Sequence, residues 1–117
     1  MDILLADNRK VRLALRVLLE QTAGLTVVGE ASNARDLLAQ TSATRPDLVL
    51  LDWTLPGLHD NGTLHTLRQI CPDLSVIVLS GRPQARKAAL AAGANAFVSK
   101  VDPPERLLAA IDEFRHE

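Results

Sequence analysis

Cysteine and aromatic side chains are scarce in this sequence. One cysteine, Cys71, occurs among the 117 residues, so no disulfide can form within the chain, and a free thiol suits a reducing compartment. Aromatic residues make up 3% of the chain, and the apolar residues are mainly leucine, alanine and valine. The sequence therefore predicts an aliphatic core within one domain of ordinary size, residues 1–117.

The chain also lacks an excess of either charge and any long apolar run. Its 13 Lys and Arg residues stand against 14 Asp and Glu residues, for a net charge of −1. Proteins that bind nucleic acids displace counterions with a basic surface, so we expect no direct nucleic-acid contact by this domain. No apolar run reaches the roughly 20 residues that a bilayer-spanning helix needs, and no signal-peptide pattern opens the chain. We therefore expect no membrane contact and a cytoplasmic location.

Short apolar runs alternate with segments in which apolar residues recur at helical spacing. The runs lack the apolar–polar alternation of a half-solvated sheet, so they indicate strands buried on both faces: residues 3–6, 25–29, 48–51, 75–79 and 96–98. Helical spacing marks residues 11–19, 34–41, 64–71, 85–92 and 107–114. Asp102 is expected to cap the last helix, with prolines in its first turn. This alternation predicts an α/β domain with a parallel sheet and helices on both faces.

Polar side chains follow four of the five predicted strands. Asp7, Asp52 and Ser80 directly follow the first, third and fourth strands, and Lys100 comes shortly after the fifth. Each has an ordinary alternative, since Asp7 could be a helix cap, Ser80 a turn residue and Lys100 a solvated charge. Because ligands of open parallel sheets bind at the carboxyl ends of the strands, we expect the four side chains to converge on one pocket.

These residue types suit metal-assisted phosphoryl transfer. Two close carboxylates repel each other, so a site that holds them also attracts a cation. Oxygen ligands without a nearby His or Cys favour Mg²⁺, which also binds phosphate. Asp52 could then attack phosphorus, while Lys100 and Ser80 stabilise the phosphoryl oxygens. An enzyme acting on a small nucleotide or a phosphate ester is an alternative, although no glycine-rich loop follows the first strand to bind a dinucleotide phosphate.

From the first predicted strand to the last helix, the chain resembles the receiver domain of response regulators in two-component signalling. The matching stretches are residues 4–12, 45–52, 55–57, 76–81, 92–94 and 96–100. Residues 100–105 are most similar to receivers that precede a helix-turn-helix output domain. The resemblance implies a flavodoxin-like fold: a doubly wound, five-stranded parallel sheet of order 2-1-3-4-5 flanked by five helices.

The resemblance also implies roles for individual residues. It makes Asp52 the phosphoacceptor, and Asp7, Asp52 and the backbone carbonyl of Thr54 the ligands of Mg²⁺. Ser80 and Lys100 would bind the phosphoryl group, and the aromatic ring of Phe97 would change rotamer together with the Ser80 hydroxyl.

The resemblance further implies partners. A sensor histidine kinase or a small phosphodonor would supply the phosphoryl group. The surface of the fourth helix, fifth strand and fifth helix would then contact an output domain or a second copy of the chain. Charges of both signs on that surface could pair across a two-fold axis; an ordinary solvated helix face is the alternative. They are Arg82, Arg86, Lys87, Asp112 and Glu113.

One departure from the family lies at the end of the first strand. Receivers usually carry two adjacent acids there, whereas this chain has Ala6, Asp7 and Asn8. A gapless register makes Asp7 the direct metal ligand and puts Ala6 in the place of the outer acid, while the other register makes Asn8 the direct ligand. Either way one negative charge is missing, which predicts weaker Mg²⁺ binding. A degenerate receiver, acting as a phosphorylation-independent protein-interaction module, is the alternative function.

Other departures lie near Asp52. Trp53, next to it, is expected to pack against the core or to cover the site partly. Residues 58–62 are expected to form a loop, longer than usual, beside the site. His59 in that loop, like His65 and His116, shows no metal-ligand spacing.

Overall fold

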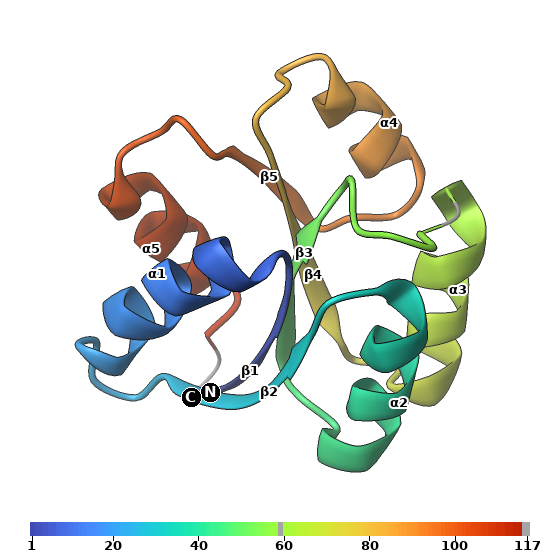
Figure 1. Cartoon of the computed structure of the whole chain (residues 1–117), viewed down its shortest axis with the longest axis horizontal. Coiled ribbons are helices and arrows are strands. Elements are labelled where there is room, and N and C mark those ends of the chain that lie inside the picture. Colours follow the sequence, from blue (N-terminus) through green and yellow to red (C-terminus); the bar gives the residue numbers. More distant parts are fainter. Residues whose placement is uncertain (59, 116–117) are drawn as a thin grey trace.

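A computed structural model describes residues 1–58 and 60–115 (Figure 1). Strands and helices alternate throughout this part of the chain as β1 (Asp2–Ala6), α1 (Arg9–Glu20), β2 (Thr26–Ala31), α2 (Ala34–Thr44), β3 (Leu48–Asp52), α3 (Asp60–Ile70), β4 (Ser75–Ser80), α4 (Ala85–Ala91), β5 (Ala96–Ser99) and α5 (Pro104–Asp112). None of these helices is both long enough and apolar enough to cross a membrane.

The strands form one parallel sheet in the order β2-β1-β3-β4-β5. Figure 1 shows α1 and α5 on one face of the sheet and α2, α3 and α4 on the other. Both the doubly wound fold class and the predicted strand order are thus confirmed.

Successive residues of each strand supply two separate apolar clusters. Ile3 and Leu5 of β1 contribute to the cluster under α1 and α5, whereas Leu4 and Ala6 contribute to the cluster under α2, α3 and α4. This alternation follows from the two-residue period of a strand. Because both faces are covered, the strands are apolar throughout rather than in alternate positions.

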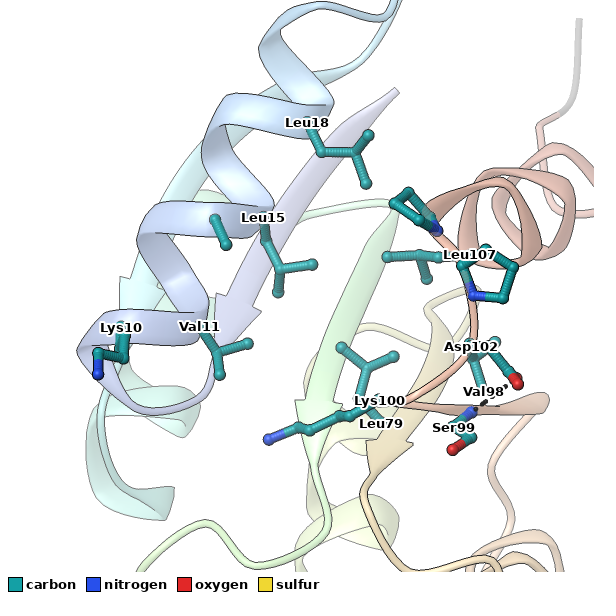
Figure 2. A pocket seen from close by; sticks show the side chains of 13 residues that line it. Lys10, Val11, Leu15, Leu18, Leu79, Val98, Ser99, Lys100, Asp102 and Leu107 are labelled. Carbon is teal, nitrogen blue, oxygen red and sulfur yellow. Dashed lines mark hydrogen bonds between the residues drawn. The ribbon is translucent and has the colours of Figure 1, made fainter.

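A groove remains open between α1 and α5. Its volume is about 400 Å³. Figure 2 shows Leu15 and Leu18 of α1 facing Leu107 of α5 across it, with Val98 and Leu79 of the sheet nearby. The groove runs up to the carboxyl end of β5.

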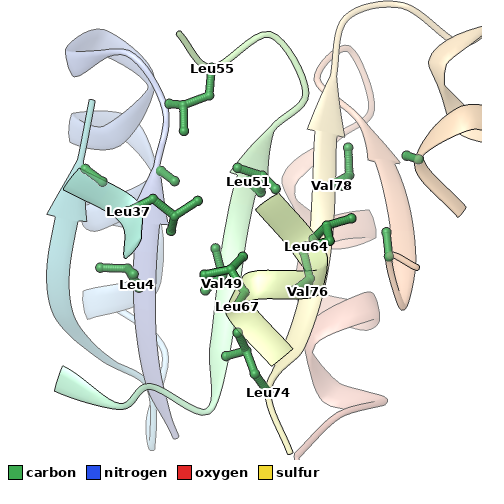
Figure 3. Close-up of a cluster of buried hydrophobic side chains, with 14 of the residues drawn as sticks. Leu4, Leu37, Val49, Leu51, Leu55, Leu64, Leu67, Leu74, Val76 and Val78 are labelled. Carbon is green, nitrogen blue, oxygen red and sulfur yellow. The ribbon is translucent and has the colours of Figure 1, made fainter. Parts of the chain in front are cut away.

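The opposite cluster is closed by helices α2 and α3. Figure 3 shows Leu37, Leu64 and Leu67 packed over Val49 and Leu51 of the central strand. Trp53 is partly buried against this cluster, which supports the packing explanation for that side chain.

Three details of the sequence interpretation need correction. Strand β2 continues past Gly29 to Ala31. A Cβ at Gly29 would lie 2.8 Å from Leu4 Cδ1 and 2.6 Å from Gln40 Oε1, so a larger residue there would force these side chains to shift. Helix α3 begins at Asp60, so Gly62 is helical and the predicted loop is shorter. His59 and His116 lie outside the described residues.

Helix α5 is not capped by Asp102 as predicted. The N-cap residue is Pro103 rather than Asp102, and it makes no side-chain capping hydrogen bond. The Asp102 carboxylate instead accepts a hydrogen bond from the Ser99 N–H at 3.3 Å. Asp102 therefore stabilises the turn that leaves β5, the segment that carries Lys100.

Candidate functional site

The strand register brings the predicted polar residues to one edge of the sheet. Ala6 is paired with Leu51, one residue before Asp7 and Asp52 respectively, and Asp52 is paired with Leu79, one residue before Ser80. Asp7, Asp52 and Ser80 are buried, with 0%, 6% and 2% of their surfaces exposed. The carboxyl ends of three adjacent strands therefore present three polar side chains at nearly the same level.

Lys100 connects the two carboxylates. Its Nζ lies 3.0 Å from Asp7 Oδ1 and 3.5 Å from Asp52 Oδ1. Figure 2 shows this side chain extending from the end of β5 toward the N-terminal end of α1. Three residues predicted from separate strand ends, Asp7, Asp52 and Lys100, are thus brought into direct contact.

Asp7 has one carboxylate oxygen occupied and one free. Oδ1 accepts hydrogen bonds from the Asn8 N–H at 2.7 Å and from Lys100. Oδ2 is buried without a hydrogen-bond partner in the described structure. Burial is the main cause that raises the pKa of Asp7, and the nearby charge of Asp52 adds to it, while the Asn8 N–H and Lys100 act in the opposite direction. A buried carboxylate with a free oxygen is a position where a cation would be stabilised.

Asp52 is oriented by the residue two positions later. The Thr54 N–H donates to Asp52 Oδ1 at 3.0 Å, and the Thr54 hydroxyl lies 3.0 Å from both carboxylate oxygens. The turn after β3 thereby fixes the plane of the carboxylate. The sequence did not predict this hydroxyl contact, although a Thr two residues after an Asp is a common turn arrangement.

The donor atoms at this edge fit Mg²⁺. The free oxygen of Asp7, the carboxylate of Asp52 and the carbonyl of Thr54 are hard oxygen ligands, which this ion prefers. No cluster of three or more His, Cys, Asp or Glu side chains suited to a metal occurs in the described part of the chain. Mg²⁺ tolerates this shortage, because it usually keeps several waters and needs only one or two carboxylates.

Neither neighbour of Asp7 replaces the missing acid. The methyl group of Ala6 lies in the core cluster with Leu4 and Leu51, so Ala6 does not occupy a position at the site as the gapless register implied. The Asn8 side chain caps α1 and accepts a hydrogen bond from the Val11 N–H at 3.0 Å. Asp7 is therefore the carboxylate that the end of β1 supplies.

Ser80 and Phe97 lie on the adjacent strands β4 and β5. The Ser80 Oγ accepts a hydrogen bond from the Arg82 N–H at 3.1 Å, and its carbonyl accepts one from the Lys100 N–H at 2.9 Å. Phe97 is partly buried against the cluster under α2, α3 and α4. It also lines a groove of about 670 Å³ between α4, β5 and α5.

Comparisons with known proteins point in one direction. The family model described as response regulator receiver domain matches residues 3–112. Over 113 residues the chain is 32% identical to the nitrate/nitrite response regulator protein NarL of Escherichia coli strain K12, which covers 95% of this chain and 52% of NarL. The chemotaxis protein CheY of Thermotoga maritima is 28% identical over 113 residues, covering 95% of this chain and 93% of CheY.

A solved structure agrees with these matches. A two-component response regulator of the LuxR family from Aurantimonas sp. SI85-9A1 gives a TM-score of 0.87 at 30% identity, covering 96% of this chain and 82% of that one. The chain spans about half the length of NarL and nearly the whole of CheY.

Proposed function

Because this chain belongs to the response regulator receiver domain family, we propose that it accepts a phosphoryl group on Asp52 in a Mg²⁺-dependent reaction. The donor is a sensor histidine kinase or a small phosphodonor. The family is one of signalling domains rather than classical enzymes; assistance by the chain in its own phosphorylation and dephosphorylation is part of the proposal. Its one cysteine is free, which suits the cytoplasmic location that we also propose.

One observation carries the proposal: two buried carboxylates share a lysine, and one of their oxygens, Asp7 Oδ2, has no hydrogen-bond partner among the residues that the structure describes. An arrangement made only for stability would satisfy that oxygen, because an unpaired buried polar atom costs about 1–3 kcal/mol. Asp7, Asp52 and the Thr54 carbonyl would hold Mg²⁺, which when bound supplies positive charge to the phosphoryl oxygens.

In the proposed step, a carboxylate oxygen of Asp52 attacks the phosphorus atom of the donor. A bond forms between that oxygen and phosphorus while the P–N bond of a phosphohistidine, or the P–O bond of an acyl phosphate, breaks. The electron pair of the broken bond leaves with the donor group: the histidine nitrogen takes up a proton, whereas the carboxylate released from an acyl phosphate stays ionised. Lys100 Nζ, already beside Asp52, offsets the negative charge that the phosphoryl oxygens bring into the site.

Transmission begins at Ser80. Its hydroxyl oxygen accepts the Arg82 N–H, so a hydroxyl that turned toward a phosphoryl group would release the backbone just before α4. The ring of Phe97, which lines the groove between α4, β5 and α5, would then turn inward. We propose that this surface then contacts an output domain or a second copy of the chain, since Arg86, Arg106 and Glu113 supply both charge signs along the groove.

A degenerate receiver remains a second candidate, because a single acid, Asp7, follows β1 where receivers usually carry two. Beryllofluoride, a mimic of a phosphoryl group, distinguishes the two when it is added with Mg²⁺ to wild type and to Asp52→Asn. We expect wild-type Trp53 fluorescence and the amide resonances of Ser80, Arg82 and Phe97 to change, and those of the variant to stay constant. A wild-type protein that gave no response would favour the degenerate receiver.

A further inference from the structure

Arg12 reaches back from α1 to the turn that carries Asp7. Its guanidinium Nη1 donates to the Asp7 carbonyl oxygen at 2.7 Å, and its backbone N–H donates to the Asn8 carbonyl at 3.0 Å. One residue of α1 thus holds two consecutive carbonyl groups of the β1–α1 turn. The Arg12 side chain is only 16% exposed, so these contacts are shielded from competing water.

Glu30 orients this guanidinium. Its Oε1 accepts a hydrogen bond from Arg12 Nε at 2.8 Å, and its Oε2 accepts from Arg16, one turn later on α1. Glu30 is the next-to-last residue of β2. The ends of β1 and β2 and the first turns of α1 are therefore connected through one charged network.

We propose that Arg12, held by Glu30, is a positioning residue for Asp7 and determines how tightly the site binds Mg²⁺. The inference rests on the proposed function, since it concerns the same metal site. Arg12 contacts neither the carboxylate of Asp7 nor that of Asp52. It acts on the site through the main-chain carbonyl of Asp7.

Several contacts fix the position of Asp7. Its N–H donates to the Ala31 carbonyl at 3.1 Å, and its carbonyl accepts from Arg12, so the backbone is held on both sides. With the backbone fixed and Oδ1 bonded to the Asn8 N–H and to Lys100, the position of the free Oδ2 is fixed as well. Without the guanidinium the Asp7 carbonyl loses its partner, and the turn can relax.

This dependence is stronger here because Asp7 is the carboxylate that the end of β1 contributes. A second acid could compensate for a displaced ligand, but Ala6 lies in the core and Asn8 caps α1. Loss of a residue that orients a metal ligand commonly weakens metal affinity by about 10- to 100-fold.

The test compares Arg12→Ala with Arg16→Ala. Arg12 and Arg16 both lie on α1 and both pair with Glu30, so each variant removes one arginine partner of Glu30. Of the two, Arg12 is the one that also contacts Asp7. Mg²⁺ binding is followed by Trp53 fluorescence, and urea unfolding of each variant is recorded in parallel. We expect the Mg²⁺ dissociation constant to rise about tenfold in Arg12→Ala and to stay within about twofold of wild type in Arg16→Ala. Equal constants in the two variants would overturn the inference.

The Mg²⁺ dependence of the phosphorylation rate distinguishes a role of Arg12 in positioning Asp7 from a general loss of structure at the site. In acetyl phosphate labelling, Arg12→Ala should need more Mg²⁺ for half-maximal rate yet reach the wild-type rate at saturating Mg²⁺. A lower maximal rate with unchanged Mg²⁺ dependence would contradict the proposal. If Arg12→Ala does not fold, Arg12→Gln, which keeps part of the stem, carries the same expectations.

Mg²⁺ binding by the wild type distinguishes failure of the proposed function from failure of the Arg12 inference. A wild-type chain that binds no Mg²⁺ would overturn the proposed function and this inference with it. Wild-type binding that Arg12→Ala leaves unchanged would overturn the inference alone.

Discussion

Lys100 and Asp7 are 93 residues apart in the sequence, yet Lys100 Nζ lies 3.0 Å from Asp7 Oδ1. The same ammonium lies 3.5 Å from Asp52. Two buried carboxylates therefore depend on one lysine for compensation of their charge.

Replacing Lys100 by Met should destabilise the chain in the presence of EDTA. Two buried carboxylates would be left without a cation, at a cost of about 1–3 kcal/mol in the free energy of unfolding. Added Mg²⁺ should recover part of that loss, because it restores positive charge between Asp7 and Asp52. Urea unfolding with EDTA and with Mg²⁺ measures both effects. Lys87→Met, the same substitution at an exposed residue of α4, should change neither value; a similar loss in this control would argue against the pairing.

An acid introduced next to Asp7 should strengthen Mg²⁺ binding at position 8 but destabilise the fold at position 6. Asn8→Asp keeps a good helix cap and places a charge near the metal site, so the Mg²⁺ dissociation constant should fall by roughly three- to tenfold at low salt. Ala6→Asp buries a carboxylate among leucines and should cost more than about 3 kcal/mol of stability. Isothermal titration with Mg²⁺ and urea unfolding test the pair. A stable Ala6→Asp protein that bound Mg²⁺ more tightly would restore the gapless register.

Glu30 should make stability depend on pH. Its pKa is lowered, mainly by the hydrogen bonds from Arg16 and further by Arg12, against an opposing effect of burial. A group whose pKa is lower in the folded state stabilises that state above its unfolded pKa, and this contribution is lost as pH falls through the folded value. Glu30→Gln should therefore cost about 1 kcal/mol near neutral pH, and the difference from wild type should shrink as pH falls below the ordinary value of 4.5.

Urea midpoints of wild type and Glu30→Gln across that pH range provide the measurement. Glu20→Gln is the control, since Glu20 forms an ion pair with Arg16 but is more exposed than Glu30. A pH-independent difference between wild type and Glu30→Gln would show that the effect does not come from ionisation.

Two glycines should respond to alanine with opposite signs. At Gly29 a Cβ would lie 2.8 Å from Leu4 Cδ1 and 2.6 Å from Gln40 Oε1, so Gly29→Ala should destabilise by about 1–3 kcal/mol through overpacking. At Gly62, inside α3, a Cβ meets nothing within 4 Å, so Gly62→Ala should stabilise by about 0.5–1 kcal/mol. Thermal unfolding measures both. A destabilised Gly62→Ala would argue against the start of α3 at Asp60.

The strand ends could be predicted from the sequence because apolar runs stop at polar residues. In a parallel sheet all carboxyl ends meet at one edge. The positions of the strand ends were therefore enough to predict that Asp7, Asp52 and Lys100 lie together. The end of β2 was missed because the apolar run stops at Gly29, whereas the strand continues through the charged Glu30 to Ala31. The cap of α5 was misplaced because an Asp before prolines resembles a capping residue, whatever its carboxylate actually contacts.

The contact between Arg12 and the Asp7 carbonyl could not be predicted in the same way. Every residue has a carbonyl, and a long guanidinium side chain can reach many of them, so spacing alone does not select a partner. Glu30 selects it here by orienting the guanidinium, and Glu30 is brought beside α1 only when β2 pairs with β1. The capping role of Asn8 is easier to predict from the sequence, because an Asn just before a helix commonly caps it.

Intact-protein mass spectrometry measures phosphoryl transfer to Asp52, on which the proposed function depends. Wild type and Asp52→Asn are incubated with acetyl phosphate and Mg²⁺, and peptides are mapped after the labelled aspartate is trapped by borohydride reduction. We expect the intact wild type to gain the mass of one phosphoryl group and the variant to gain none. Because borohydride reduction releases the phosphate and converts a phosphorylated aspartate to homoserine, the reduced wild-type peptide should carry homoserine at position 52. A wild type that gains no phosphoryl group, or gains it on another residue, would contradict the account.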